Sequence, residues 1–210
     1  MGRPKAIKHP PHPKPVKHLP ESQFDLVVIA CSAGGLAAFG RVLSGLPPDF
    51  PVPVALVMHL APSTASPLCD ILQRSTRLTV EWARQGSRLR PGHIYIAPPD
   101  QHLLVNANFS CRLSLATKVS WVRPAADVLF ASAAAAFGSR VLGVVLSGAG
   151  QDGANGAVAI HDAGGTVVAQ APDSSEVSGM PTAAIDRGGT DLVVPLDSVA
   201  STLINLVARH

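Results

Sequence analysis

Short apolar runs alternate with segments of helical periodicity along almost the whole chain, from Phe24 to the C-terminus. The apolar runs, such as FDLVVIA and VPVALVMH, contain few polar residues, as is typical of parallel strands buried on both faces. The segments between them are long enough for crossover helices. This alternation predicts an α/β fold: a doubly wound, mostly parallel sheet with helices on both faces, in a three-layer α/β/α arrangement.

The expected elements are delimited by these patterns and by the glycines and prolines between them. Strands are expected in FDLVVIA, VPVALVMH, LTVEWA, HIYIAPP, RVLGVVLSGAG, GTVVAQ and DLVVPL. The segment HLLVNANFSCRLSL, with its polar turn, is expected to form a hairpin. Helices are expected in GGLAAFGRVLSGL, SPLCDILQRS, AADVLFASAAAAFG, GANGAVAIHDAGG and DSVASTLINLVAR, with Asp197 as the N-cap of the last.

The first 22 residues differ sharply in composition from the rest. They read MGRPKAIKHPPHPKPVKHLPES, which is rich in Pro, Lys and His and has no apolar period. Closely spaced prolines forbid a helix and favour an extended, solvated chain. We therefore expect a disordered basic tail at 1–22 and one folded domain at 23–210.

The positive charge of the chain belongs to this tail. The net charge is +3, residues 1–20 contribute +5, and the remainder therefore carries −2. A basic tail on a weakly acidic domain does not predict a nucleic-acid-binding fold. An electrostatic tether and weak metal binding through the tail histidines both remain open as roles for the tail.

The cysteines indicate a reducing compartment. Cys31, Cys69 and Cys111 are scattered, with neither CxxC nor Cys/His ligand spacing, so no disulfide framework or structural zinc site is expected. The chain contains no apolar stretch of transmembrane length and no apolar core of a signal peptide. A cytoplasmic protein without stable membrane insertion is expected.

The functional residues of such a sheet are expected beyond the carboxyl ends of its strands. The first strand ends in VVIACSAGG, where Ser32 is followed by Ala33, Gly34 and Gly35. A serine in a tight strand-to-helix turn can present its hydroxyl as a nucleophile, and small residues leave backbone N–H groups open to an oxyanion. The same turn could instead bind a phosphate, although it lacks the first glycine of a dinucleotide fingerprint. Spacing alone leaves both interpretations open.

Two further strand ends supply the partners that a serine nucleophile needs. His59 directly follows the second strand, where it could act as a general base or as a hydrogen-bonded structural residue. Asp152 follows the strand RVLGVVLS, where it could cap the next helix or orient a histidine. With Ser32 they form a candidate nucleophile, base and orienting acid on three strand ends of one sheet.

A family resemblance rests on six separated motifs, which occur in order from Phe24 to the C-terminus. The motifs are IACSAGG, VMHLAPSTAS, GHIYIAPPDQHLLV, RPAADVLF, LSGAGQDGANG and VSGMPTAAI. Together they resemble the catalytic domain of the CheB-type chemotaxis protein-glutamate methylesterases. No receiver-domain pattern precedes the first strand, so the resemblance is to the catalytic domain without the receiver domain.

The resemblance implies a serine hydrolase of signal transduction. Its substrates would be glutamate methyl esters on the cytoplasmic helices of methylated chemoreceptors, with methanol released, and it implies deamidation of some receptor glutamines. It places the catalytic triad on Ser32, His59 and Asp152. Ester hydrolysis by such a triad needs no metal or organic cofactor, and no nucleic acid is expected as a partner.

Further residues are expected around the substrate. The backbone N–H groups of Ala33 or Gly34, and of Ala149, are expected to bind the developing oxyanion. Arg123 and Met180 lie in family-like motifs and are expected to line the substrate groove.

The sequence departs from the family pattern near the site. Ala30 and Cys31 stand where Gly and then Ala or Ser are usual, Ala149 where Met is frequent, and Thr182 where Arg is common. These departures leave a catalytically weak binding or regulatory module as the alternative, and a nucleotide-binding domain as a third class. Because neighbouring strand residues point to opposite faces, Cys31 is expected to face the core when Ser32 faces the cleft.

Overall fold

The computed structural model describes residues 22–59 and 67–208 of the chain. Its centre is a seven-stranded sheet in the order β3-β4-β2-β1-β7-β8-β9, in which every neighbouring pair is parallel. The strands are β1 (Leu26–Cys31), β2 (Val54–Met58), β3 (Thr79–Trp82), β4 (His93–Ile96), β7 (Val141–Val145), β8 (Thr166–Gln170) and β9 (Leu192–Val194). The predicted parallel sheet is confirmed. The tail expected at 1–22 lies, except for its last residue, outside the described residues.

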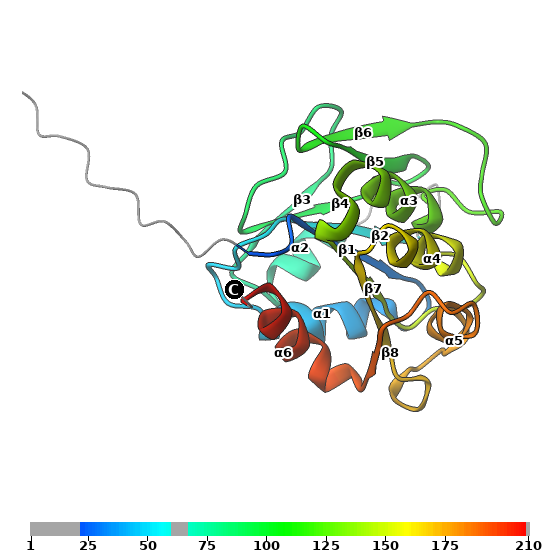
Figure 1. The fold of residues 1–210 in the computed structure, drawn as a ribbon. Coiled ribbons are helices and arrows are strands. Elements are labelled where there is room, and N and C mark those ends of the chain that lie inside the picture. The colour runs from blue at the N-terminus through cyan, green and yellow to red at the C-terminus, as the bar shows by residue number, and fades with distance from the viewer. Residues whose placement is uncertain (1–21, 60–66, 209–210) are drawn as a thin grey trace, which may run out of the picture.

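Helices cover both faces of this sheet (Figure 1). One face carries α1 (Gly35–Gly45), α2 (Leu68–Gln73) and α6 (Leu196–Val207); the other carries α3 (Ala126–Phe137), α4 (Ala154–Asp162) and α5 (Gly179–Asp186). The antiparallel hairpin of β5 (His102–Asn106) and β6 (Ser110–Ser114) packs outside α3, and 3₁₀ turns lie at Gly138–Arg140 and Pro172–Ser174. The predicted three-layer arrangement and the hairpin are confirmed.

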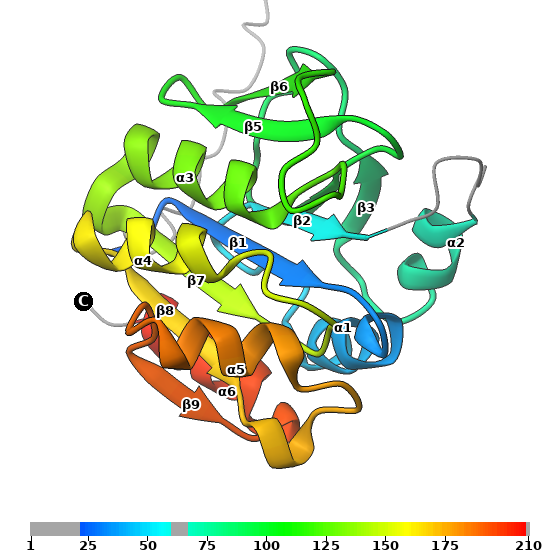
Figure 2. The same cartoon turned by 90° about the vertical axis from the view of Figure 1, so that its right-hand side faces the viewer.

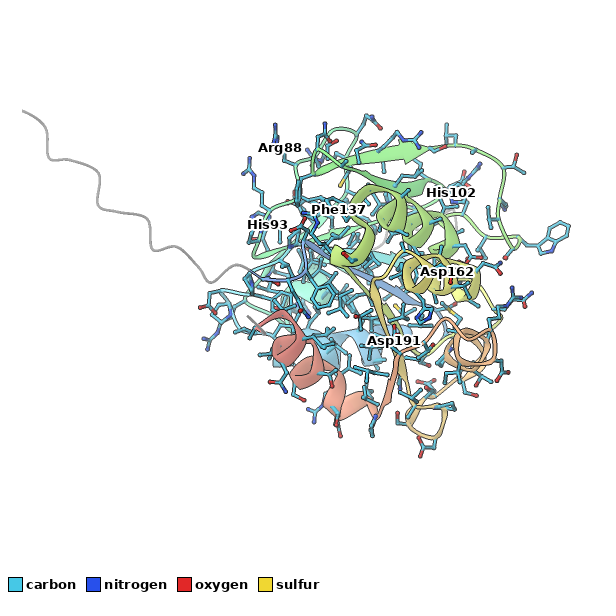
Figure 3. The ribbon with its side chains drawn as sticks, viewed as in Figure 1. Arg88, His93, His102, Phe137, Asp162 and Asp191 are labelled. Carbon is cyan, nitrogen blue, oxygen red and sulfur yellow. The ribbon has the colours of Figure 1, made fainter. Side chains whose placement is uncertain are left out.

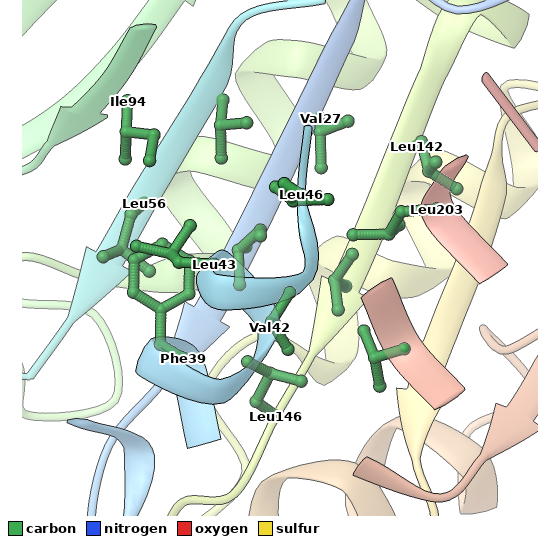
Figure 4. Close-up of a cluster of buried hydrophobic side chains, with 14 of the residues drawn as sticks. Val27, Phe39, Val42, Leu43, Leu46, Leu56, Ile94, Leu142, Leu146 and Leu203 are labelled. Atoms are coloured by element: carbon green, nitrogen blue, oxygen red, sulfur yellow. The ribbon is translucent and has the colours of Figure 1, made fainter. Parts of the chain in front are cut away.

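Alternate side chains of the central strand β1 pack into two apolar cores, one on each side of the sheet. In β1, Val27 and Ile29 point toward α1 and α6, whereas Leu26 and Val28 point toward α3. Figure 4 shows the first core, to which the helices contribute Phe39, Val42, Leu43 and Leu203. Each fully buried side chain of this size contributes about 1.5–3 kcal/mol. Packing on both faces thus fixes β1, and with it the turn that follows.

Two helices differ from the sequence-based expectation. α6 begins at Leu196 with Pro195 at its N-cap, so the prediction that Asp197 caps this helix was wrong. The Asp197 carboxylate instead accepts a 2.8 Å hydrogen bond from Nε of Arg41 on α1. α5 has no counterpart among the expected helices, because its sequence begins GMP, and proline is tolerated only near the start of a helix.

The longest helices, α3 and α6, have 12 residues each. Within residues 22–59 and 67–208, no helix combines the length and the apolar character needed to cross a membrane.

The strand order reverses at β1, which is where the candidate residues meet. The chain passes from β1 to β2 on one side, while β7 lies on the other side of β1. In sheets of this type, ligands bind in the crevice beyond the carboxyl ends of the strands at such a point. Ser32 follows β1, His59 follows β2, and the loop with Asp152 follows β7, so all three reach the same edge of the sheet (Figure 2).

Candidate active site

The turn after β1 is crowded on every side. The Ser32 N–H donates to the carbonyl of Ser147 at 3.0 Å, and the N–H of Gly35 closes the turn on the Ser32 carbonyl at 2.8 Å. Gly34 has φ +72°, and a Cβ there would lie 2.8 Å from Oγ of Ser147. A Cβ on Gly35 would lie 2.7 Å from Cβ of Cys31. The two glycines are therefore required by backbone conformation and by close approach, and they leave Ser32 at the rim of the sheet.

Cys31 faces away from this rim, as expected. Its side chain is fully buried in the core on the α1 side. Burial raises the pKa of the Cys31 thiol well above its ordinary range. The thiol therefore stays protonated and unreactive at neutral pH, although it is adjacent in sequence to Ser32.

His59 is held by a carboxylate at one ring nitrogen. Its Nε2 lies 2.7 Å from Oδ2 of Asp152, and its backbone N–H donates to the carbonyl of Cys31 at 3.3 Å. The His59 side chain is 14% exposed and that of Asp152 is 3% exposed. Because a carboxylate accepts hydrogen bonds, Nε2 carries the hydrogen, and Nδ1 keeps its lone pair. The imidazole is thus oriented with an acceptor nitrogen left over for a second partner.

Asp152 does not cap the helix that it precedes. α4 has Gly153 at its N-cap and no side-chain cap hydrogen bond. The Asp152 carboxylate instead accepts the N–H of Ala126 at 2.6 Å and the N–H of Asp127 at 3.1 Å, both in the first turn of α3. One carboxylate therefore caps α3 and binds His59 through the same oxygen, Oδ2. These bonds fix Asp152 before any substrate arrives.

Asp127 makes the reciprocal contact: Asp152 caps α3, and Asp127, which lies on α3, caps α4. From the first turn of α3, its Oδ1 accepts the N–H groups of Gly153 and Gly156 at 2.9 and 2.8 Å, which caps α4. Burial raises the pKa of the Asp127 carboxyl, and the charge of Asp152 adds to the rise. Sequence reasoning missed this residue. The available signal was an acidic residue in the first turn of a predicted helix, which usually indicates only a helix-dipole interaction.

Ser32 and His59 line one open cavity of about 580 Å³ at the edge of the sheet. Leu36 and Ile71, from α1 and α2, line the same cavity with largely apolar surface. The fold thus brings together the three residues of the candidate triad. Ser32 and His59 line the cavity, and Asp152 is hydrogen-bonded to His59. An ester carbonyl that entered this cavity would meet a hydroxyl and an imidazole.

Of the expected oxyanion donors, Gly34 lines this cavity, Ala33 follows Ser32 in the same turn, and Ala149 follows Gly148, which packs against the Ser32 side chain. Within the described parts of the chain, no carbonyl or side chain accepts from the backbone N–H of Ala33, Gly34 or Ala149. The neighbouring N–H of Gly148, in contrast, donates to the carbonyl of Val177 at 2.8 Å. Unpaired N–H groups beside a serine hydroxyl can bind a developing negative charge.

Arg123 and Met180 are placed differently from the expectation that they line the groove. Arg123 donates through Nε and an Nη to Oδ1 of Asp100 at 3.0 and 2.8 Å, and through its other Nη to two backbone carbonyls. Met180 is fully buried, with its Sδ packed against Gly148. The expectation that Met180 lines the groove was therefore wrong for its side chain, because this side chain is buried in the apolar core. Arg123 braces a loop and is not among the residues that line the cavity.

Ser147 is a second residue that sequence reasoning missed. Its Oγ donates to the carbonyl of Ala33 at 2.9 Å and accepts the N–H of Val177 at 3.0 Å, while its own N–H donates to Oε1 of Gln170. It therefore joins the Ser32 turn to the segment before α5. Its only sequence signal was a serine at the carboxyl end of a buried strand.

Comparisons with known proteins agree with this geometry. The family model "CheB methylesterase" matches residues 27–203. The "Protein-glutamate methylesterase/protein-glutamine glutaminase 2" of Anaeromyxobacter dehalogenans is 43% identical over 88% of this chain and 54% of its own length. The protein of the same name from Pseudomonas aeruginosa is 39% identical over the same shares. The chain thus spans about half the length of these curated relatives.

A solved structure extends the comparison to the fold. The CheB methylesterase catalytic domain of Thermotoga maritima superposes with a TM-score of 0.84 and 36% identity. The match covers 88% of this chain and 99% of that domain. Sequence and fold agree over the region that carries Ser32, His59 and Asp152, and the chain belongs to the CheB methylesterase family.

Proposed function

We propose that this chain is a serine carboxylesterase that hydrolyses glutamate methyl esters on proteins, with Ser32, His59 and Asp152 as its catalytic triad. The observation that carries the proposal is the 2.7 Å contact between His59 Nε2 and Asp152 Oδ2, beside the cavity that His59 shares with Ser32. The substrate class is drawn from the names of the relatives, which are protein-glutamate methylesterases and protein-glutamine glutaminases.

The first half of the reaction transfers the acyl group to the enzyme. Nδ1 of His59 takes the proton of Ser32 Oγ as this oxygen bonds to the ester carbonyl carbon. The N–H groups of Ala33 or Gly34, and of Ala149, bind the resulting oxyanion, at about 3 kcal/mol for each donor. Protonated Nδ1 then gives its proton to the methoxy oxygen, the C–O bond breaks, and methanol leaves.

The second half restores the enzyme. Nδ1 removes a proton from water as the water oxygen attacks the acyl carbon, and the returning proton releases Ser32 and the glutamate carboxyl. The Asp152 carboxylate stabilises the imidazolium in both halves and remains ionised. A glutamine side chain would follow the same path with ammonia as the leaving group.

The partners proposed for this chemistry are the cytoplasmic helices of methylated chemoreceptors. A reducing cytoplasm is supported by the state of the cysteines, since Cys31, Cys69 and Cys111 are all free thiols in the described structure. The largely apolar wall of the cavity suits the methyl group of a neutral ester.

The direct test is methanol release from a methylated chemoreceptor cytoplasmic fragment by the purified protein. The wild type is expected to release methanol, and the turnover number of Ser32→Ala is expected to be about 10⁶-fold lower. Ser44→Ala, which removes an exposed serine on α1 away from the cavity, serves as the matched control. Equal methanol release by the wild type and Ser32→Ala would refute the assignment of the nucleophile.

A further inference from the structure

Exposed apolar side chains lie both in the cavity of the candidate site and in the loop that leads into α3. Among the described residues, six large apolar side chains are exposed: Leu36, Ile71, Leu115, Trp121, Leu192 and Val193. Leu36 and Ile71 line the cavity of Ser32 and His59. Leu115 and Trp121 belong to residues 115–122, called here the Trp121 segment. Trp121 is 92% exposed, more than any other of the six.

The Trp121 segment leads directly into the helix that holds the triad acid. Trp121 is five residues before Ala126, whose N–H binds Asp152, so the two Cα atoms are at most about 18 Å apart. Figure 2 shows this stretch between the β5–β6 hairpin and the carboxyl ends of the central strands. His59 lines the cavity together with Leu36 and Ile71, and its Nε2 lies 2.7 Å from the Asp152 carboxylate. The Trp121 segment and the cavity are therefore linked through the start of α3, Asp152 and His59.

Ser120 and Trp121, at the tip of the segment, have a left-handed backbone conformation that their side chains disfavour. Ser120 and Trp121 have φ of +51° and +67°, and Val119 and Val122 exchange backbone hydrogen bonds around them at 3.2 and 3.0 Å. Two consecutive positive φ values define a type I′ turn, for which Asn-Gly is the usual sequence. A bulky tryptophan there is strained, and strain of this kind concentrates at functional sites. Folding alone gives no reason for a solvated indole at this position.

Two buried or half-buried side chains hold the segment in place. His102 of β5 is 1% exposed; its Nε2 lies 3.2 Å from the carbonyl of Thr117, and its Nδ1 accepts the N–H of Ala125 at 3.1 Å (Figure 3). Arg123 binds the carbonyls of Leu115 and Ala116 at 2.8 and 2.9 Å. The strained tip is thus presented on a fixed base, which is how anchors of protein interfaces are pre-organised.

We propose that the Trp121 segment is a docking site for the protein helix that presents the methyl ester, an inference that rests on the proposed function. An amphipathic helix lying across this face would contact Trp121 and Leu115 on one side of the ester and Leu36 and Ile71 on the other. The cavity would hold the ester side chain, and Trp121 would contact the adjacent turns of the substrate helix as an aromatic anchor.

A ratio of two activities tests this docking site. For each variant, kcat/KM is measured with a methylated receptor fragment and with a small ester such as 4-nitrophenyl acetate, and the first is divided by the second. Trp121→Ala is expected to lower the ratio at least tenfold, mainly through KM, and Trp121→Phe is expected to restore most of it. Val193→Ala, which truncates an exposed apolar side chain on the edge strand β9, is expected to leave the ratio unchanged.

Binding without turnover separates the docking site from the chemistry. In the Ser32→Ala background, the receptor fragment is expected to shift the fluorescence of Trp121 to the blue, and the Trp121→Ala protein provides the background from Trp82. An unchanged activity ratio in Trp121→Ala, or a shift caused by anionic lipid vesicles and absent with the fragment, would overturn the docking proposal. Hydrolysis of the small ester with no methanol from the fragment, but with the fluorescence shift present, would instead overturn the proposed function.

Discussion

Asp127 and Asp152 are two buried carboxylates that cap each other's helices, yet only Asp152 reaches a histidine. Asp127 accepts the N–H groups of Gly153 and Gly156 at the start of α4, and Asp152 accepts those of Ala126 and Asp127 at the start of α3. Oδ2 of Asp152 also lies 2.7 Å from Nε2 of His59. One pair of reciprocal helix caps therefore joins α3 to α4 and also holds the acid of the candidate site in place.

Of the two carboxylates, Asp152 is expected to give the larger effect on catalysis when it is changed. Asp152→Asn keeps the size of the side chain and removes the charge that orients and stabilises the imidazolium of His59. The turnover number is expected to fall about 10⁴-fold, as in comparable triads. Steady-state kinetics, with circular dichroism to confirm the fold, measures this loss. A turnover within tenfold of the wild type would show that Asp152 only caps α3.

The partner carboxylate is expected to affect stability more than chemistry. Asp127→Ala leaves the N–H groups of Gly153 and Gly156 buried without their acceptor. The free energy of unfolding is expected to fall by about 2–6 kcal/mol, since each of the two orphaned donors costs about 1–3 kcal/mol. Urea unfolding measures this change. A loss below about 0.5 kcal/mol, or a kinetic defect as large as that of Asp152→Asn in the folded protein, would remove the contrast between the two residues.

A smaller effect is expected from the titration of Asp127. Burial raises the pKa of its carboxyl in the folded state above the value near 3.9 that it has in the unfolded chain. The folded state therefore binds this proton more tightly, and the group favours folding most below about pH 3.9 and less as pH rises through its folded pKa. From pH 4 to 7, the wild type is expected to lose free energy of unfolding relative to Asp127→Asn. A relative gain over this range would contradict the raised pKa.

Most of the fold could be predicted from the sequence, because its strands are apolar runs with clear boundaries. The run from Leu26 to Cys31 is buried throughout, and the hairpin at 102–114 was marked by its polar turn. Capping was harder to predict. Asp197 precedes an apolar helical pattern and makes no cap, while Asp152 caps a helix 26 residues earlier in the chain. Caps that come from another helix depend on tertiary packing, which no local pattern encodes.

The candidate site divides in the same way. Ser32 and His59 could be found because each directly follows a buried strand. The bonds of Asp127, Ser147 and His102 could not be found, since all of them join segments that are distant in sequence. Met180 shows the reverse error: its motif indicated the site, but its apolar side chain is buried beneath Gly148.

Covalent labelling by a fluorophosphonate probe, followed by peptide mapping, most directly tests whether Ser32 is a nucleophile activated by His59. The probe requires a nucleophilic hydroxyl and forms a stable bond to its oxygen. Label is expected on Ser32 of the wild type, none on Ser32→Ala, and labelling at least 10³-fold slower on His59→Ala with the fold retained. Labelling of Ser32→Ala at the wild-type rate, or of His59→Ala as fast as the wild type, would contradict the triad.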